Sequence, residues 1–195
     1  MTANESLAQR DLFGGALKLS MPMRFVDVSD FRPVPDNQEV FADANRDQSV
    51  VVEVLERADV PDDRCAVLFF EDLAEHNEAA SSSLDSVTTP GPTAVPHLPN
   101  DTFVSVARGA QAVSKGRQGQ EALNQVQICQ ACIRLPSVDS DLLITLNTPM
   151  HISEHSAAAE HAGAGAKDAH VTAPQLLQDM LLTLEIKDWG LFGGA

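Results

Sequence analysis

Six stretches of the chain are apolar throughout or alternate between apolar and polar residues, as β-strands do. In the segment Ser49–Leu55, apolar residues fall at both odd and even positions, so both faces of that strand need cover. The predicted strands are Ala16–Leu19, Glu39–Ala42, Ser49–Leu55, Thr102–Ala107, Val126–Leu135 and Leu142–Leu146. We therefore expect one sizeable sheet with helices packed on it.

Two segments have the 3.6-residue period of helices that bury one face. The first follows Pro61, and the acidic residues Asp62 and Asp63 favour a helix N-terminus there. Its predicted buried side chains are Ala66, Phe69, Phe70 and Leu73. The second begins with a predicted capping box of Thr172 and Gln175. Its predicted buried stripe is Leu176, Leu177, Met180, Leu181 and Leu184.

Two long stretches show neither period and are expected to be surface loops. Residues 79–99 include three consecutive serines and four prolines, and residues 149–171 are rich in Ala, Gly and His. The predicted strands on both sides of these stretches are needed to complete one sheet. A chain of 195 residues can hold one good-sized core, so we expect residues 1–195 to form a single domain.

The pentapeptide LFGGA occurs twice, at Leu12–Ala16 and at Leu191–Ala195. A duplicated domain would show a repeat over tens of residues, and nothing around the two copies matches. We interpret the pair as a coincidence and expect the apolar side chains of both copies to anchor the chain ends. Those side chains are Leu12, Phe13, Leu191 and Phe192.

Charge and hydropathy narrow the choice of partner and compartment. The 28 acidic and 13 basic residues give a formal net charge of -15, which disfavours nucleic acid and anionic lipid and favours a basic protein surface. The longest apolar run, Cys65–Phe70, is far shorter than the roughly 20 residues that span a bilayer, so no membrane span is expected. The start, MTANESLAQRD, lacks the features of a secretory signal or transit peptide. We expect the protein in the nucleus and cytoplasm.

The common catalytic signatures GxSxG, HExxH and GxxxxGK are missing from the chain. We therefore expect a protein that is not an enzyme, with no catalytic residue and no cofactor. Cys129 and Cys132 form a CxxC inside a predicted strand, where residues three apart point to opposite faces. They are not expected to share a metal ion, and together with Cys65 they are interpreted as reduced thiols.

A small hydrolase or metal enzyme built on histidines is an alternative. His151 and His155 are four residues apart with Glu154 between them, and His161 and His170 follow. On a helix this spacing could present two imidazoles to one metal ion. The segment is rich in glycine and has no firm helical period, so we interpret these as solvated loop histidines and expect no metal site.

The segment RPVPDNQEVF, Arg32–Phe41, differs from the rest of the chain. Pro33 and Pro35 hold the backbone extended, and the sequence PDN favours a turn before the next predicted strand. Asp36 and Glu39 therefore lie on a segment whose backbone is conformationally restricted. From the residues alone, the simpler interpretation is that Asp36 bonds its own turn and that Glu39 is a solvated residue at a strand edge.

The chain resembles the Ran guanine nucleotide release factor family (the Mog family) nearly from end to end. The segments that carry the resemblance are LFGGA near the start, FVDVSDFRPVPDNQEVF, DQSVVVEVLE, FFEDLAEHN, ACIRLP, DSDLLITLN and LLTLEIKDWGLFG. The resemblance implies a single α/β/α sandwich with a central, largely antiparallel sheet. It also implies binding of the small GTPase Ran, promotion of guanine nucleotide release and a part in nuclear protein transport. We expect the protein to be a monomer.

The same resemblance implies where Ran binds. In this family the acidic residues of the PDxQEV motif belong to the Ran-binding surface, so Asp36 and Glu39 are expected to contact Ran. Asn37 and Gln38 are flanking candidates. Residues 79–99 and 149–171 are not among the matching segments. Two alternatives stay open. One is an extrinsic photosystem II subunit of the PsbP type, whose fold resembles the same sandwich. The other is an adaptor for other protein partners.

Overall fold

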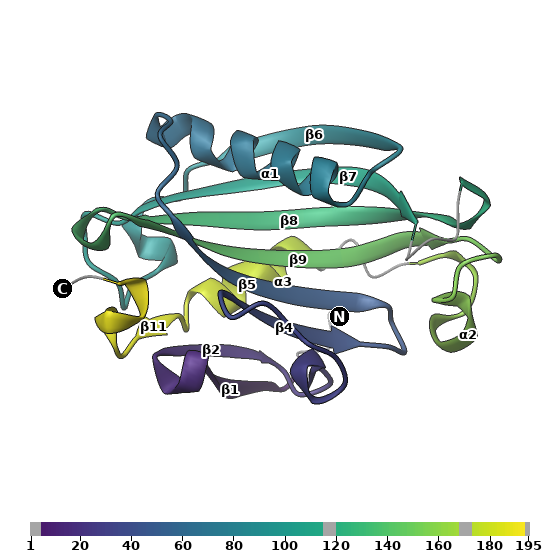
Figure 1. Cartoon of the computed structure of the whole chain (residues 1–195), viewed down its shortest axis with the longest axis horizontal. Helices are drawn as coiled ribbons and strands as arrows, with labels where there is room; N and C mark the ends of the chain where they lie inside the picture. The colour runs from purple at the N-terminus through teal and green to yellow at the C-terminus, as the bar shows by residue number, and fades with distance from the viewer. Residues whose placement is uncertain (1–4, 115–119, 168–172, 194–195) are drawn as a thin grey trace.

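A central antiparallel sheet dominates the computed structural model, which describes residues 5–114, 120–167 and 173–193 (Figure 1). Its strands, in spatial order, are β3 (Val26–Asp27), β4 (Gln38–Asp43), β5 (Gln48–Glu56), β9 (Ser140–Ile152), β8 (Leu123–Leu135), β7 (Phe103–Ser114) and β6 (Ser81–Thr88). The short strand β10 (Gly165–Ala166) pairs with the end of β9. Every pairing is antiparallel, which confirms the predicted type of sheet.

The two faces of this sheet are covered by different elements. Helix α1 (Cys65–His76) lies in front of the sheet in Figure 1, and helix α3 (Ala173–Leu181) lies behind it. A second, three-stranded sheet shares the face with α3 and consists of β1 (Leu7–Leu12), β2 (Leu17–Pro22) and β11 (Glu185–Ile186). The expected α/β sandwich is therefore present, and the small sheet is an addition to it.

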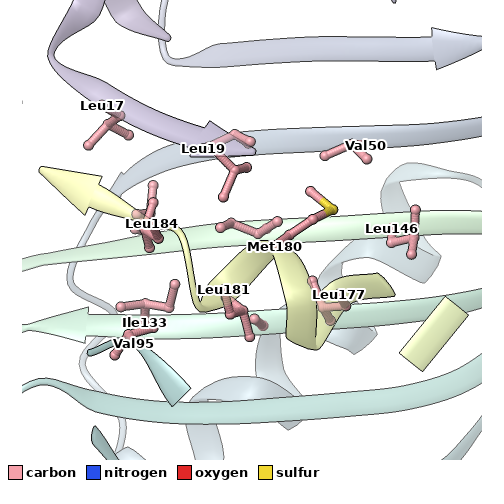
Figure 2. Packing of buried hydrophobic residues seen from close by; sticks show 14 of the residues in the cluster. Leu17, Leu19, Val50, Val95, Ile133, Leu146, Leu177, Met180, Leu181 and Leu184 are labelled. Atoms are coloured by element: carbon pink, nitrogen blue, oxygen red, sulfur yellow. The ribbon is translucent and has the colours of Figure 1, made fainter. Parts of the chain in front are cut away.

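Alternation along the long strands creates two apolar layers. Ile133 of β8 and Leu146 of β9 belong to the larger core, between the central sheet, α3 and the small sheet. Cys132 and Leu143, on the same two strands, belong to the smaller core under α1. Side chains from β2, α3 and the central sheet meet in the larger core together with Val95 and Leu184, which lie outside these elements. Figure 2 shows this packing for Leu17, Leu19, Val50, Val95, Ile133, Leu146, Leu177, Met180, Leu181 and Leu184.

Both predicted helices are present. A 3-10 turn at Asp62–Arg64 precedes α1, whose buried residues are Cys65, Ala66, Phe69 and Phe70. Leu177, Met180 and Leu181 of α3 are buried as expected, and Leu184 is buried just beyond the helix. Thr172 of the predicted capping box lies outside the described residues. Within the described part of the chain, no helix combines the length and apolarity needed to cross a membrane.

The prediction of a loop throughout residues 79–99 is wrong. Residues 81–88 form β6, an edge strand that pairs with β7 and whose eight residues are all exposed. A strand exposed on both faces needs no apolar alternation, so its serine-rich sequence gave no strand signal. Residues 89–99 do lack regular strands, but Val95 and Leu98 are buried and tie this segment to the larger core.

The prediction of a loop at 149–171 is wrong in part. Residues 149–152 complete β9, and the segment continues through the single-turn helix α2 (Ala159–Ala162) to β10. Pro149 lies beyond the pairing of β9 with β5, which ends at Asn147. Proline is tolerated in a strand where a ladder hydrogen bond is not required, so Pro149 does not end β9. Residues 168–171 lie outside the described part of the chain.

Both LFGGA segments anchor the chain ends, as predicted. Leu12 and Phe192 are buried in the larger core, and Phe13 and Leu191 pack against it. The backbone near both copies is also connected, because the Ala16 carbonyl accepts hydrogen bonds from the amides of Lys187 and Asp188 at 2.8 and 3.1 Å.

A buried ion pair fixes the segment between β5 and α1. Arg134 and Asp141, on β8 and β9, both have fully buried side chains, and Arg134 Nε donates to Asp141 Oδ1 at 3.0 Å. The same guanidinium donates to the carbonyls of Ala58 and Val60, both at 2.6 Å, and to Asp62 Oδ1 at 2.9 Å. The pKa of Asp62 is lowered by its hydrogen bond from Arg134. Every nitrogen of the buried guanidinium therefore has a partner.

Candidate protein-binding site

The PDNQ turn, Pro35–Gln38, is held by the backbone at the start of β4. The Gln38 amide donates to the Pro35 carbonyl at 2.9 Å, and the Val54 amide of β5 donates to the Asn37 carbonyl at 2.9 Å. The Asn37 side chain adds a hydrogen bond from Nδ2 to the Val54 carbonyl at 3.3 Å. These bonds attach the turn to the sheet without any contribution from the side chain of Asp36.

Asp36 lies at the tip of this turn and is exposed. Among the described residues its carboxylate has no hydrogen bond and no ion pair. The simpler interpretation, in which Asp36 bonds its own turn, is therefore wrong. Since backbone bonds hold the turn, this carboxylate is available to a partner at little cost in ordering the chain.

Glu39 points to the face of the sheet opposite to that of its neighbour Gln38, because consecutive strand residues face opposite ways. Its side chain is half-buried, and its Oε1 accepts a hydrogen bond from the Phe13 amide at 2.6 Å. Phe13 has a left-handed backbone, with φ of 49°, inside the first LFGGA segment. Glu39 is thus more than a solvated edge residue, because it supports this turn. Spacing along the chain gave no sign of a contact between residues 26 positions apart.

The flanking candidates bring in a carboxylate that sequence reasoning missed. Gln38 Nε2 donates to Glu53 Oε1 at 2.9 Å, and Asn37 Nδ2 reaches the same oxygen at 3.4 Å. Glu53 lies opposite Gln38 in the pairing of β4 with β5. Within the described chain, neither Asp36, Glu39 nor Glu53 forms an ion pair with a basic side chain. The turn therefore presents negative charge that no cation of the described residues neutralises.

The other candidates from the sequence do not come together as a metal or catalytic site. No group of three or more His, Cys, Asp or Glu residues in the described ranges is placed to hold a metal ion. The Nε2 atom of His155 lies 3.6 Å from Oε1 of Glu154. His161 is on the short helix α2, and His170 lies outside the described residues. Within the described ranges these histidines thus form no shared metal site, although His151 and His155 line the same open pocket.

The three cysteines are buried free thiols, as predicted. Cys129 belongs to the larger core and Cys132 to the smaller one, which confirms that the CxxC pair faces opposite sides of the sheet. A hydrogen bond from Cys132 lowers the pKa of the Cys65 thiol to about 7. Burial raises the pKa of Cys129 to about 11. Full burial of all three keeps them from solvent reagents.

Comparison with known proteins gives consistent results across sequence and structure. The family described as Ran-interacting Mog1 protein matches residues 10–149. The chain is 37% identical over 187 residues to the Ran guanine nucleotide release factor of Danio rerio, covering 94% of this chain and 99% of that protein. It is 32% identical over 197 residues to the nuclear import protein MOG1 of Saccharomyces cerevisiae, covering 93% of this chain and 83% of that protein.

The fold is similar to that of a solved relative as well. The crystal structure of the Saccharomyces cerevisiae Ran-binding protein Mog1p superposes with a TM-score of 0.69 at 26% sequence identity, over 97% of this chain and all of that one. The family match includes the whole PDNQ turn, β4 and β5. The chain belongs to the family of Ran-interacting Mog1 proteins.

Proposed function

We propose that this chain is a single Ran-binding domain that promotes release of guanine nucleotide from Ran and thereby acts in nuclear protein transport. It would act as a monomer in the nucleus and cytoplasm, without enzymatic activity of its own and without a cofactor. Support for Ran as the partner comes from the names of its relatives, which include a Ran guanine nucleotide release factor and a nuclear import protein. The family assignment favours this function over a photosystem II subunit.

The observation that carries the proposal is the uncompensated charge of the PDNQ turn. Asp36 is exposed and without a partner among the described residues, and Glu39 uses one carboxylate oxygen for the Phe13 amide. We assign both carboxylates to the Ran contact, with Asn37 and Gln38 beside them. A rigid turn with unpaired charge is suited to a basic protein surface, since little flexibility is lost on binding.

Nucleotide release would follow from competition between two arrangements of Ran. The turn carboxylates would pair with basic Ran side chains in an arrangement that tight nucleotide binding disfavours. Complex formation would then loosen the nucleotide. Because linkage is reciprocal, GTP or GDP must weaken the complex by the same factor by which the complex weakens nucleotide binding.

Titration calorimetry with three forms of Ran tests this function. The full chain is expected to bind nucleotide-free Ran most tightly, and saturating GTP or GDP is expected to reduce that affinity. A parallel assay of fluorescent nucleotide dissociation from Ran should show faster release when the chain is added. An affinity for Ran that saturating nucleotide leaves unchanged would rule out the release mechanism, and no binding to any form would rule out the function.

A further inference from the structure

A groove of about 920 Å³ lies beside α1, on the face of the central sheet that carries this helix. α1 packs mainly against β6, β7 and β8, so it leaves the same face of β4 and part of that of β5 uncovered (Figure 1). Apolar residues supply much of the floor and one wall: Val40, Val51, Leu55, Leu143, Phe69 and Leu73. A recess of this size and lining is large enough to hold several side chains of another molecule.

The floor contains a buried amide whose oxygen lacks a hydrogen-bond partner. Gln130 lines the groove and is only 2% exposed, and its Nε2 donates to Thr145 Oγ1 at 3.1 Å. Its Oε1 has no partner among the described residues. Because this oxygen is itself shielded from solvent, Gln130 serves as a probe of the groove floor and not as a direct contact.

Carboxylates outnumber basic groups along the groove. Its titratable lining residues are four carboxylates, one guanidinium and two imidazoles: Asp43, Asp47, Glu53, Asp72, Arg32, His76 and His161. Asp43 is already paired with Arg24 at 3.0 Å, and among the described residues Glu53 bonds only amide groups. Asp72, on the wall formed by α1, is exposed and has no partner among the described residues. The lining therefore favours a bound segment with a positive charge.

The groove is continuous with the PDNQ turn. Gln38 belongs to the turn and also lines the groove, and its side chain bonds Glu53, another lining residue. We propose that the groove receives a surface segment of Ran that carries a Lys or Arg side chain beside apolar ones. This inference rests on the proposed function and extends the Ran contact from Asp36 across the open sheet face to Asp72.

Charge reversal on α1 tests this extension without touching the turn. Asp72→Lys is expected to lower the affinity for Ran about tenfold, since it places a positive charge on the groove wall. Glu71→Lys is the matched control, because Glu71 is exposed on the same helix and is not part of the groove lining. This substitution changes the net charge by the same amount as Asp72→Lys. Its affinity should stay within about twofold of the unsubstituted chain. Circular dichroism and urea unfolding establish that both variants fold.

Nuclear magnetic resonance reports directly on the groove floor, where a purely structural role of Asp72 would cause no change when Ran binds. The side-chain amide signals of Gln130 are expected to shift when unlabelled nucleotide-free Ran is added to the labelled full chain. Equal affinities of the two folded variants, or Gln130 signals that do not move at saturation, would overturn the groove proposal while leaving the proposed function intact. If the unsubstituted chain does not bind Ran at all, the proposed function itself fails.

Discussion

Two groups of charged side chains near the end of β5 behave in opposite ways. At Arg134, the guanidinium is surrounded by two carboxylates and two carbonyl oxygens, all of which accept its hydrogen bonds. At the PDNQ turn, Asp36, Glu39 and Glu53 form no ion pair within the described chain. Burial explains the difference, because Arg134 is unexposed and its charge must be satisfied internally.

This contrast separates charges that maintain the fold from charges that are available to a partner. The Arg134 network connects β8 and β9 to the segment that leads into α1. The carboxylates at the turn accept fewer hydrogen bonds. Glu39 accepts one from the Phe13 amide, and Glu53 accepts those of the Gln38 and Asn37 side chains. Substitutions should therefore reduce stability most at Arg134 and least at Asp36, and should reduce Ran binding in the reverse order.

The largest loss of stability is expected for Arg134→Leu. This substitution leaves Asp141 buried without a cation, which should cost about 3 to 5 kcal/mol in the free energy of unfolding. Urea unfolding followed by circular dichroism measures that loss. The double variant Arg134→Met with Asp141→Leu is the control. It should regain part of the lost stability, because no buried charge remains unpaired, while the Ala58 and Val60 backbone groups still lose their partners. A single variant within about 1 kcal/mol of the original chain would show that the network is not important for the fold.

An intermediate effect is expected at Glu39. Glu39→Ala removes the acceptor of the Phe13 amide, which should cost about 1 to 3 kcal/mol of stability. Glu39→Gln keeps an oxygen in that position, so its unfolding free energy should stay within about 0.5 kcal/mol of the original. Ran affinity should fall for both variants, because both lose the charge. If Glu39→Gln binds Ran normally, then Glu39 only supports the turn and is not a charged contact.

A smaller effect on stability, which depends on pH, is expected at Asp62. Its hydrogen bond from Arg134 lowers the pKa of Asp62 below the ordinary value in the folded state, so the unfolded chain binds more protons as pH falls. This contribution is present at neutral pH and is lost as pH falls below about 4. Because the side chain is 45% exposed, it should be about 1 kcal/mol or less.

Asp62→Asn, compared with the original chain by urea unfolding between pH 3 and 7, isolates this contribution. The difference in stability should be constant near neutral pH and should shrink on acidification. A difference that grows towards low pH would contradict the sign of the shift.

The fold was predictable where burial imposed a pattern on the chain. The two-sided apolar strand β5 and the amphipathic helix α1 were recognised because their buried residues follow the geometry of a strand and a helix. The edge strand β6 was missed because no residue in it is buried. Short strands such as β11, with two residues, depend on a neighbour that is remote in sequence.

The candidate site was predictable only through the family resemblance. Composition gave the acidic turn, but the bond from Glu39 to Phe13 and the pairing of Gln38 with Glu53 join residues at least 15 positions apart. Such contacts depend on the register of β4 with β5 and on the docking of the small sheet. Neither the register nor the docking leaves a signal in the spacing of residues along the chain.

The charge reversal Asp36→Lys tests the central claim most directly. Asp101→Lys is the control, because Asp36 and Asp101 are both exposed and lack a partner among the described residues. Both variants should therefore have nearly the unfolding free energy of the original chain. Calorimetry with nucleotide-free Ran should show a loss of about 2 to 5 kcal/mol in binding free energy for Asp36→Lys alone. Normal Ran affinity of a folded Asp36→Lys variant would contradict the assignment of the PDNQ turn as the Ran contact.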